Sequence, residues 1–129
     1  MSDWLRDAAL VGAGGFLGAL GRFLLTGWLQ ARFAHFPYGT LAVNLVGSLA
    51  LGFLVTALAD RLLTDSSFRL LAMVGFLGAF TTFSAFSYET ALLWQDGRWL
   101  ALCANIGLNV GGCLLATTLG ILAARAITT

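Results

Sequence analysis

The chain has 129 residues, of which 59% are hydrophobic and only 10% are charged, and its formal net charge is +1. A soluble core cannot bury so much apolar surface, so the composition is typical of a membrane protein. With a net charge this close to zero, the chain is not basic enough to be expected to bind nucleic acid. One histidine and two cysteines make a weak metal-binding set.

Four apolar runs are long enough to cross a bilayer as helices, which takes about 20 residues each. They cover approximately residues 8–29, 38–59, 70–94 and 99–124. The connections between them are short, which leaves no room for a soluble domain and puts both ends of the chain on one side. The sequence therefore predicts an all-α membrane protein with a single four-helix domain over residues 1–129.

The first run contains an arginine on a face of small residues. Gly14, Gly18 and Arg22 are four residues apart and share one side of a helix. An arginine inside a span usually faces protein or water, which favours a structural or vestibule role. The alternative is that Arg22 extends toward the membrane interface near Trp28.

The second run carries one strongly polar side chain, Asn44, with Ser48 and Gly52 following at four-residue spacing. An asparagine amide can donate two hydrogen bonds, as an anion site requires. The alternative is that Asn44 links two helices, an interaction worth ~0.6–2 kcal/mol.

The third run concentrates hydroxyl groups at mid-bilayer depth, where lipid offers them no partners. The hydroxyl residues are Thr81, Thr82, Ser84 and Ser87. Because Gly75 and Gly78 precede them, we expect a helix break at 78–81 whose carbonyl groups could ligate a cation. Phe83 and Phe86 are three residues apart and share a face. Together these features indicate a site for a small ion; the alternative is a kinked helix whose hydroxyls bond to their own carbonyls.

Glu89 lies about two turns beyond the expected break. It could pair with an arginine, act as a proton-linked gate, or be an interfacial acid.

The fourth run has a polar stripe at four-residue spacing, made of Asn105, Asn109, Cys113 and Thr117. Gly112, Ala116 and Gly120 form a neighbouring series that permits close helix packing. The pattern indicates a helix that lines a narrow hydrophilic track, although interhelical hydrogen bonding would also explain the asparagines.

Arginines are distributed almost evenly between the two expected membrane faces. Four lie on the side of the termini and two in the other loops: Arg6, Arg61, Arg69 and Arg125 against Arg32 and Arg98. The positive-inside rule orients such a chain poorly, so insertion in both orientations is physically plausible.

Three segments carry a resemblance to a known family. They are the G-x-x-x-G-x-x-x-R spacing over 14–22, GTLAVNLVGS at 39–48 and GFLGAFTTFSAFS at 75–87. With these segments the chain resembles the Fluc (CrcB-type) small fluoride channels over essentially its whole length. The resemblance implies passive fluoride export across the cell inner (plasma) membrane by a homodimer of antiparallel, dual-topology subunits. It also implies a central sodium ion.

The resemblance assigns roles by position. Asn44 would donate its amide to fluoride, and Phe83 and Phe86 would present the positive edges of their rings to the ion. Gly78 and Thr81 would give main-chain carbonyls to sodium. The remaining matches to the family's pathway and vestibule are Ser84, Asn109, Cys113, Thr117 and Arg22. Glu89 is expected beside them in a vestibule or structural role, on its own position in the span.

The chain departs from the family pattern at several positions. Ala85 replaces a threonine of the T-T-F-S-T-F-S block, and Cys113 stands where a hydroxyl residue is usual. Ala79 and Phe80 replace a commoner glycine and leucine, which predicts a stiffer break. These changes bear on the conduction rate more than on the identity of the ion.

Three other kinds of function are the alternatives. A small dual-topology multidrug exporter has a similar length, but it needs an acid in the middle of its first span, where this chain has Arg22. An enzyme is not expected, since there are no paired carboxylates and no nucleophile beside a base. A structural assembly subunit would move no ions in liposomes.

Overall fold

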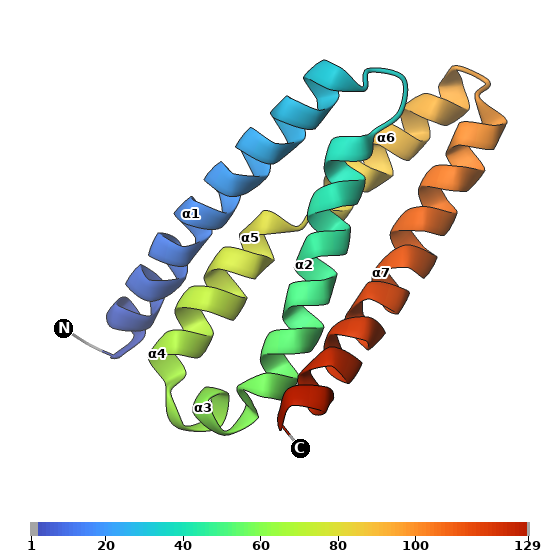
Figure 1. The fold of residues 1–129 in the computed structure, drawn as a ribbon. Helices are drawn as coiled ribbons and strands as arrows, with labels where there is room; N and C mark the ends of the chain where they lie inside the picture. The colour runs from blue at the N-terminus through green and yellow to red at the C-terminus, as the bar shows by residue number, and fades with distance from the viewer. Residues whose placement is uncertain (1–2, 129) are drawn as a thin grey trace.

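The computed structural model describes residues 3–128, and nearly all of them are helical (Figure 1). Four segments are long and apolar enough to cross a membrane: Asp3–Arg32 (α1), Tyr38–Ala57 (α2), Ser66–Gln95 and Trp99–Thr128 (α7). The all-α fold class and the four spans are therefore confirmed. Helices α1 and α7 continue beyond the apolar runs, because backbone hydrogen bonds along a helix do not need an apolar side chain at each turn.

The third span is assembled from four pieces. It begins with α4 (Ser66–Phe68), continues through a π-helix, η1 (Arg69–Leu77), and α5 (Gly78–Phe80), and resumes as α6 (Phe83–Gln95). A further short helix, α3 (Ala59–Thr64), lies in the connection from α2, where the sequence indicated only a loop. Asp65 begins the span by accepting the Phe68 amide at 3.0 Å, which caps α4.

The break in the third span changes its packing partner. Before the break, η1 and α5 pack against α1; after it, α6 packs against α7. Helix α2 contacts both α1 and α7, and α6 passes behind it to reach α7 (Figure 1). Without the interruption, one straight helix could not lie along α1 at one end and α7 at the other.

Glycines hold α1 and η1 in backbone contact. An added Cβ at Gly14 or Gly18 would overlap the carbonyl oxygen of Leu71 or Phe76. A Cβ at Gly75 would lie 2.6 Å from the Val11 carbonyl oxygen. The small-residue face of the first run is thus a packing face, and Gly75 is required for close approach instead of for flexibility.

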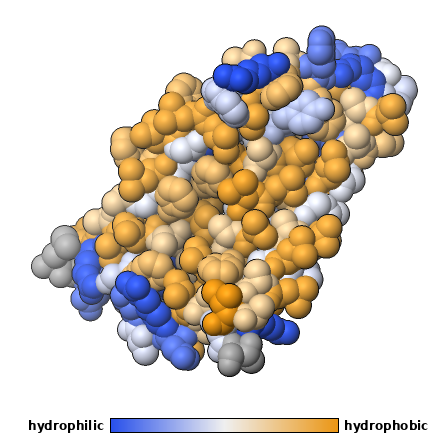
Figure 2. Space-filling model, in the orientation of Figure 1, coloured by the Kyte–Doolittle hydropathy of each residue, from blue (hydrophilic) through white to orange (hydrophobic). Residues whose placement is uncertain are grey.

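The surface is divided as expected for a membrane protein. On the face shown in Figure 2, hydrophobic residues cover the middle of the molecule, and hydrophilic residues gather at its two ends. Helix α1 begins and α7 ends at the same end of the bundle, together with α3 and α4 (Figure 1). An even number of spans therefore places both ends of the described chain on one membrane face.

Candidate functional site

The helix break lies at Thr81–Thr82, at the C-terminal end of the expected 78–81 segment. Gly78 is helical, with φ −61° and ψ −35°, whereas Thr81 has φ −85° and ψ 159°. Thr82 is also extended, with φ −152° and ψ 118°, and its hydroxyl accepts the Ala85 amide at 3.1 Å to cap α6. The expectation that glycine marks the break was wrong, because capping and extended geometry suit β-branched threonine.

Asn44 of α2 binds the break as a neighbouring strand would. Its Oδ1 accepts the Thr82 amide at 2.8 Å, and its Nδ2 donates to the Thr82 carbonyl at 3.0 Å. The Thr82 amide, which a continued α-helix would direct to the Gly78 carbonyl, is diverted to Asn44. One half-buried side chain thus stabilises the interruption by satisfying both backbone groups of Thr82.

Arg22 reaches the same break from the other side. Its Nη1 donates to the Thr81 carbonyl at 3.2 Å, and the residue is partly buried. The arginine therefore lies against protein, bound to a carbonyl that the break exposes, and does not extend to the interface.

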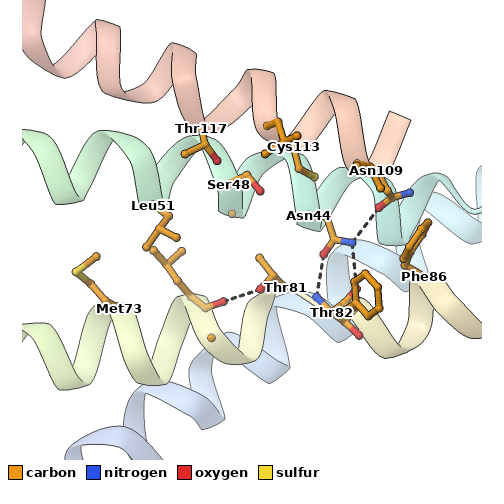
Figure 3. A pocket seen from close by; sticks show the side chains of 16 residues that line it. Asn44, Ser48, Leu51, Met73, Thr81, Thr82, Phe86, Asn109, Cys113 and Thr117 are labelled. Carbon is orange, nitrogen blue, oxygen red and sulfur yellow. Dashed lines mark hydrogen bonds between the residues drawn. The ribbon is translucent and has the colours of Figure 1, made fainter. Parts of the chain in front are cut away.

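A cavity of about 520 Å³ opens beside the break, between α2, α7 and the third span (Figure 3). Of the residues assigned to the fluoride pathway, it gathers six: Asn44, Phe83, Phe86, Asn109, Cys113 and Thr117. Gly78 and Thr81 line it as well. Helical spacing of four residues on α2 and α7 explains why residues far apart in the sequence share this cavity.

The two phenylalanines pack edge to face but differ in exposure. Their ring centroids are 5.3 Å apart at an interplanar angle of 61°. Phe86 is 7% exposed, whereas Phe83 is 75% exposed. Phe86 is thus fixed by its surroundings, and Phe83 extends from the surface of the chain.

The NH₂ group of Asn109 donates to Asn105 and not into the cavity. Its Nδ2 donates to the carbonyl and the side-chain oxygen of Asn105, at 3.1 and 3.0 Å. Its Oδ1 accepts from Asn44 at 3.0 Å (Figure 3). Both amide hydrogens of Asn44 therefore have protein acceptors, one of which is Asn109.

Ser84 does not join this cavity. It lines a second one of about 570 Å³, together with Arg22, Thr40 and Glu89. Its hydroxyl lies 3.2 Å from that of Thr82. The register of α6, which starts only at Phe83, turns Ser84 away from Phe86 and explains the difference from the expected position.

Glu89 is bound to a threonine and not to an arginine. The Thr40 hydroxyl donates to its Oε1 at 2.6 Å. The second carboxylate oxygen is buried and has no hydrogen-bond partner among the described residues. Arg22 and Glu89 thus bring opposite charges to one cavity without a direct ion pair in the described chain.

Two contributors were not assigned from the sequence. Ser48 lines the first cavity one turn beyond Asn44, and its four-residue spacing was the available signal. Thr82 organises the break, but the run of hydroxyls around it did not distinguish it from its neighbours.

A family model described as "CrcB-like protein, Camphor Resistance (CrcB)" matches residues 9–121. The chain belongs to this family. The match includes the break, Asn44 and the cavity-lining part of α7, so the site lies within the region that defines the family. The chain is accordingly a multi-pass integral protein of the plasma membrane.

Several relatives share nearly the full length of the chain. A "Fluoride-specific ion channel FluC" of Alteromonas mediterranea is 49% identical, covering 94% of this chain and 96% of the relative. Proteins with the same name from Sulfurovum sp. and Geotalea uraniireducens are 47% and 44% identical, covering 87% and 88% of this chain. The matched regions cover 88% of the Sulfurovum protein and 92% of the Geotalea protein.

Proposed function

We propose that this chain forms a fluoride-selective channel through which fluoride leaves the cytoplasm passively, down its electrochemical gradient. Relatives of nearly equal length bear the name of fluoride-specific channels, and the family is not one of enzymes. The observation that carries the proposal is the pairing of Asn44 with the Thr81–Thr82 break beside a cavity with Phe83 and Phe86. The multidrug-exporter alternative is not favoured.

Fluoride would pass by exchanging hydrogen bonds with Asn44. Because an amide has two hydrogens and both are engaged, fluoride binds Asn44 only by replacing one acceptor. The Asn109 oxygen is the replaceable one, since the Thr82 carbonyl is part of the pair that holds the break. The edges of the Phe83 and Phe86 rings carry partial positive charge and suit the anion beside the amide. Cys113 and Thr117 would continue the pathway along α7.

The second cavity supports a vestibule role for Arg22, with Ser84 and Glu89. A guanidinium at mid-span raises the local fluoride concentration, while its bond to the Thr81 carbonyl keeps it out of the narrow path.

A second, antiparallel copy of the chain would complete the channel, and the four spans of each copy would act as one transmembrane unit. Phe83 is 75% exposed at mid-span, next to polar surface that lipid does not satisfy. A copy packed on this face would cover the ring and enclose the open cavity. The nearly even arginine distribution is compatible with insertion in both orientations.

Main-chain carbonyls at the break are suitable ligands for a structural sodium ion between the copies. Gly78 and Thr81 would contribute, since both line the open cavity and the Thr82 amide does not occupy the Gly78 carbonyl. The Thr81 carbonyl keeps one lone pair beyond its bond to Arg22. The ion would supply positive charge where two sets of carbonyl dipoles meet.

Fluoride efflux from liposomes that contain only the purified protein tests the channel function. With a potassium gradient and valinomycin to balance charge, we expect rapid fluoride efflux, no chloride efflux and no need for a proton gradient. Cation movement that depends on a proton gradient, without fluoride flux, would identify an exporter. No ion movement at all would identify a structural subunit.

Asn44→Asp tests the central residue. The substitution removes both amide donors but keeps an oxygen that can accept the Thr82 amide. We expect at least about a tenfold loss of flux, since a hydrogen bond to a charged group contributes about 1.5–3 kcal/mol. Full flux in an Asn44→Asp protein of unchanged oligomeric state would mean that the pathway lies elsewhere.

A further inference from the structure

The three asparagines of the chain form one continuous hydrogen-bonded series. They are Asn44, Asn105 and Asn109, and the sequence contains no others. Asn105 is fully buried and Asn109 is 5% exposed. The channel function uses Asn44 at one end of this series and leaves Asn105 without a role.

Thr90 fixes the direction of the series at its far end. Its hydroxyl donates to the Phe86 carbonyl at 2.7 Å, so its single hydrogen is already used. The Thr90 oxygen can then only accept, and it accepts the Asn105 Nδ2 at 2.9 Å. This bond turns the Asn105 oxygen toward Asn109.

Each amide in turn orients the next one. The Asn105 oxygen accepts the Asn109 Nδ2 at 3.0 Å, which leaves the Asn109 oxygen for Asn44. That oxygen accepts the Asn44 Nδ2 at 3.0 Å (Figure 3). If one buried amide were reversed, two oxygens or two NH₂ groups would face each other, and this is costly away from water.

We propose that Thr90 and Asn105 are positioning residues that hold Asn44 with its NH₂ group toward the ion pathway. Neither residue lines the cavity, so both act through Asn109. The Thr82 amide holds the Asn44 oxygen from one side, and the series that starts at Thr90 holds the Asn44 NH₂ group from the other. A reversed Asn44 would present its oxygen, which repels an anion. The proposal rests on the proposed fluoride channel, because it assigns the orientation of the group that binds the ion.

Thr90→Val tests the role with little change of shape, and Thr90→Ser is the matched control. Valine removes the acceptor of Asn105, whereas serine keeps it. We expect fluoride flux to fall about fivefold or more in Thr90→Val, the factor for the net loss of one ordinary hydrogen bond. Thr90→Ser should stay within about twofold of the original protein. Thr90→Val is preferred to Asn105→Ala, because truncation of a fully buried side chain can prevent folding.

Selective ¹⁵N labelling of asparagine measures the side-chain NH₂ signals directly. A role of Thr90 in stability alone would not shift the Asn44 signal. With three asparagines, the spectrum contains three side-chain NH₂ signals. Asn44→Asp and Asn109→Asp assign two of them, and the remaining signal belongs to Asn105. In Thr90→Val, the Asn44 and Asn109 signals should shift together with that of Asn105; in Thr90→Ser all three should stay. An unmoved Asn44 signal in folded Thr90→Val protein, or unchanged fluoride flux, would overturn the proposal.

The two measurements also separate this inference from the channel function. If the original protein moves no fluoride, the channel function fails, and the role toward the ion fails with it. The signal shifts in Thr90→Val would still decide whether Thr90 orients Asn44.

Discussion

At the scale of single residues, the site combines groups that the protein holds firmly with one that it leaves exposed. Asn44 is fixed by three hydrogen bonds to Thr82 and Asn109, and Phe86 is buried. Phe83, which follows the break directly, is 75% exposed. An aromatic ring left open beside the cavity is consistent with contact to the ion and to a second copy, and it adds little to the stability of a single chain.

Phe83→Ile separates these roles. Isoleucine keeps an apolar side chain but has no positive ring edge, so we expect fluoride flux to fall about tenfold while the oligomeric state stays that of the original protein. Phe16 is 68% exposed on α1 and lines neither cavity, so Phe16→Ile is the matched control and should leave flux unchanged. Flux in liposomes and size-exclusion elution are the measurements. Equal flux in the two variants would remove Phe83 from the pathway.

At the scale of elements, the third span is positioned by its partners instead of by its own helix propensity. Its first half is a π-helix in backbone contact with the glycines of α1. Its second half starts from a cap on Thr82 and packs against α7. Since Arg22 of α1 and Asn44 of α2 both bond to the break between the halves, the packing of these two helices determines where the break lies.

Gly18→Ala should therefore lower the stability of the protein far more than the addition of one methyl group suggests. The added methyl group would overlap the Phe76 carbonyl oxygen, and overpacking of this kind costs about 1–3 kcal/mol. Gly12 lies on the same helix with open space around it, so Gly12→Ala should be neutral or slightly stabilising. Thermal unfolding in detergent compares the two; equal midpoints would mean that α1 and η1 do not pack this closely.

At the scale of the whole molecule, one protomer leaves an open cavity and exposed Phe83 at mid-bilayer depth. Polar side chains such as Ser48 and Thr117 line this cavity. Polar groups open to hydrocarbon are costly, and an antiparallel copy would cover them. Such a pair requires both orientations in one membrane, and the arginine distribution does not oppose this.

Labelling from outside the cell tests the orientation. In a background of Cys103→Ala and Cys113→Ser, Thr128→Cys and Asp96→Cys place single thiols at opposite ends of the bundle. With dual insertion, an impermeant maleimide should label about half of the protein in each variant, and all of it after detergent is added. Complete labelling of one variant and none of the other would establish a single orientation and exclude the antiparallel pair.

The sequence was sufficient for the parts of the fold that depend on local pattern. Runs of apolar residues determined four spans, since only a helix satisfies its backbone in lipid. Four-residue spacing brought Asn44, Asn109, Cys113 and Thr117 to one cavity, because such spacing fixes a helix face. The family motifs at 14–22, 39–48 and 75–87 indicated the ion.

Only the tertiary structure decided where the break falls, which cavity Ser84 enters and which way each amide points. The backbone leaves the helix at Thr81 instead of Gly78 because Asn44, 38 residues earlier, satisfies Thr82, and Arg22 binds the Thr81 carbonyl. Glycine spacing predicts where a chain can bend, but partners from other helices determine where it does bend. For the same reason, the direction of the asparagine series depends on the Thr82 amide at one end and on Thr90 of α6 at the other, contacts that no local pattern contains.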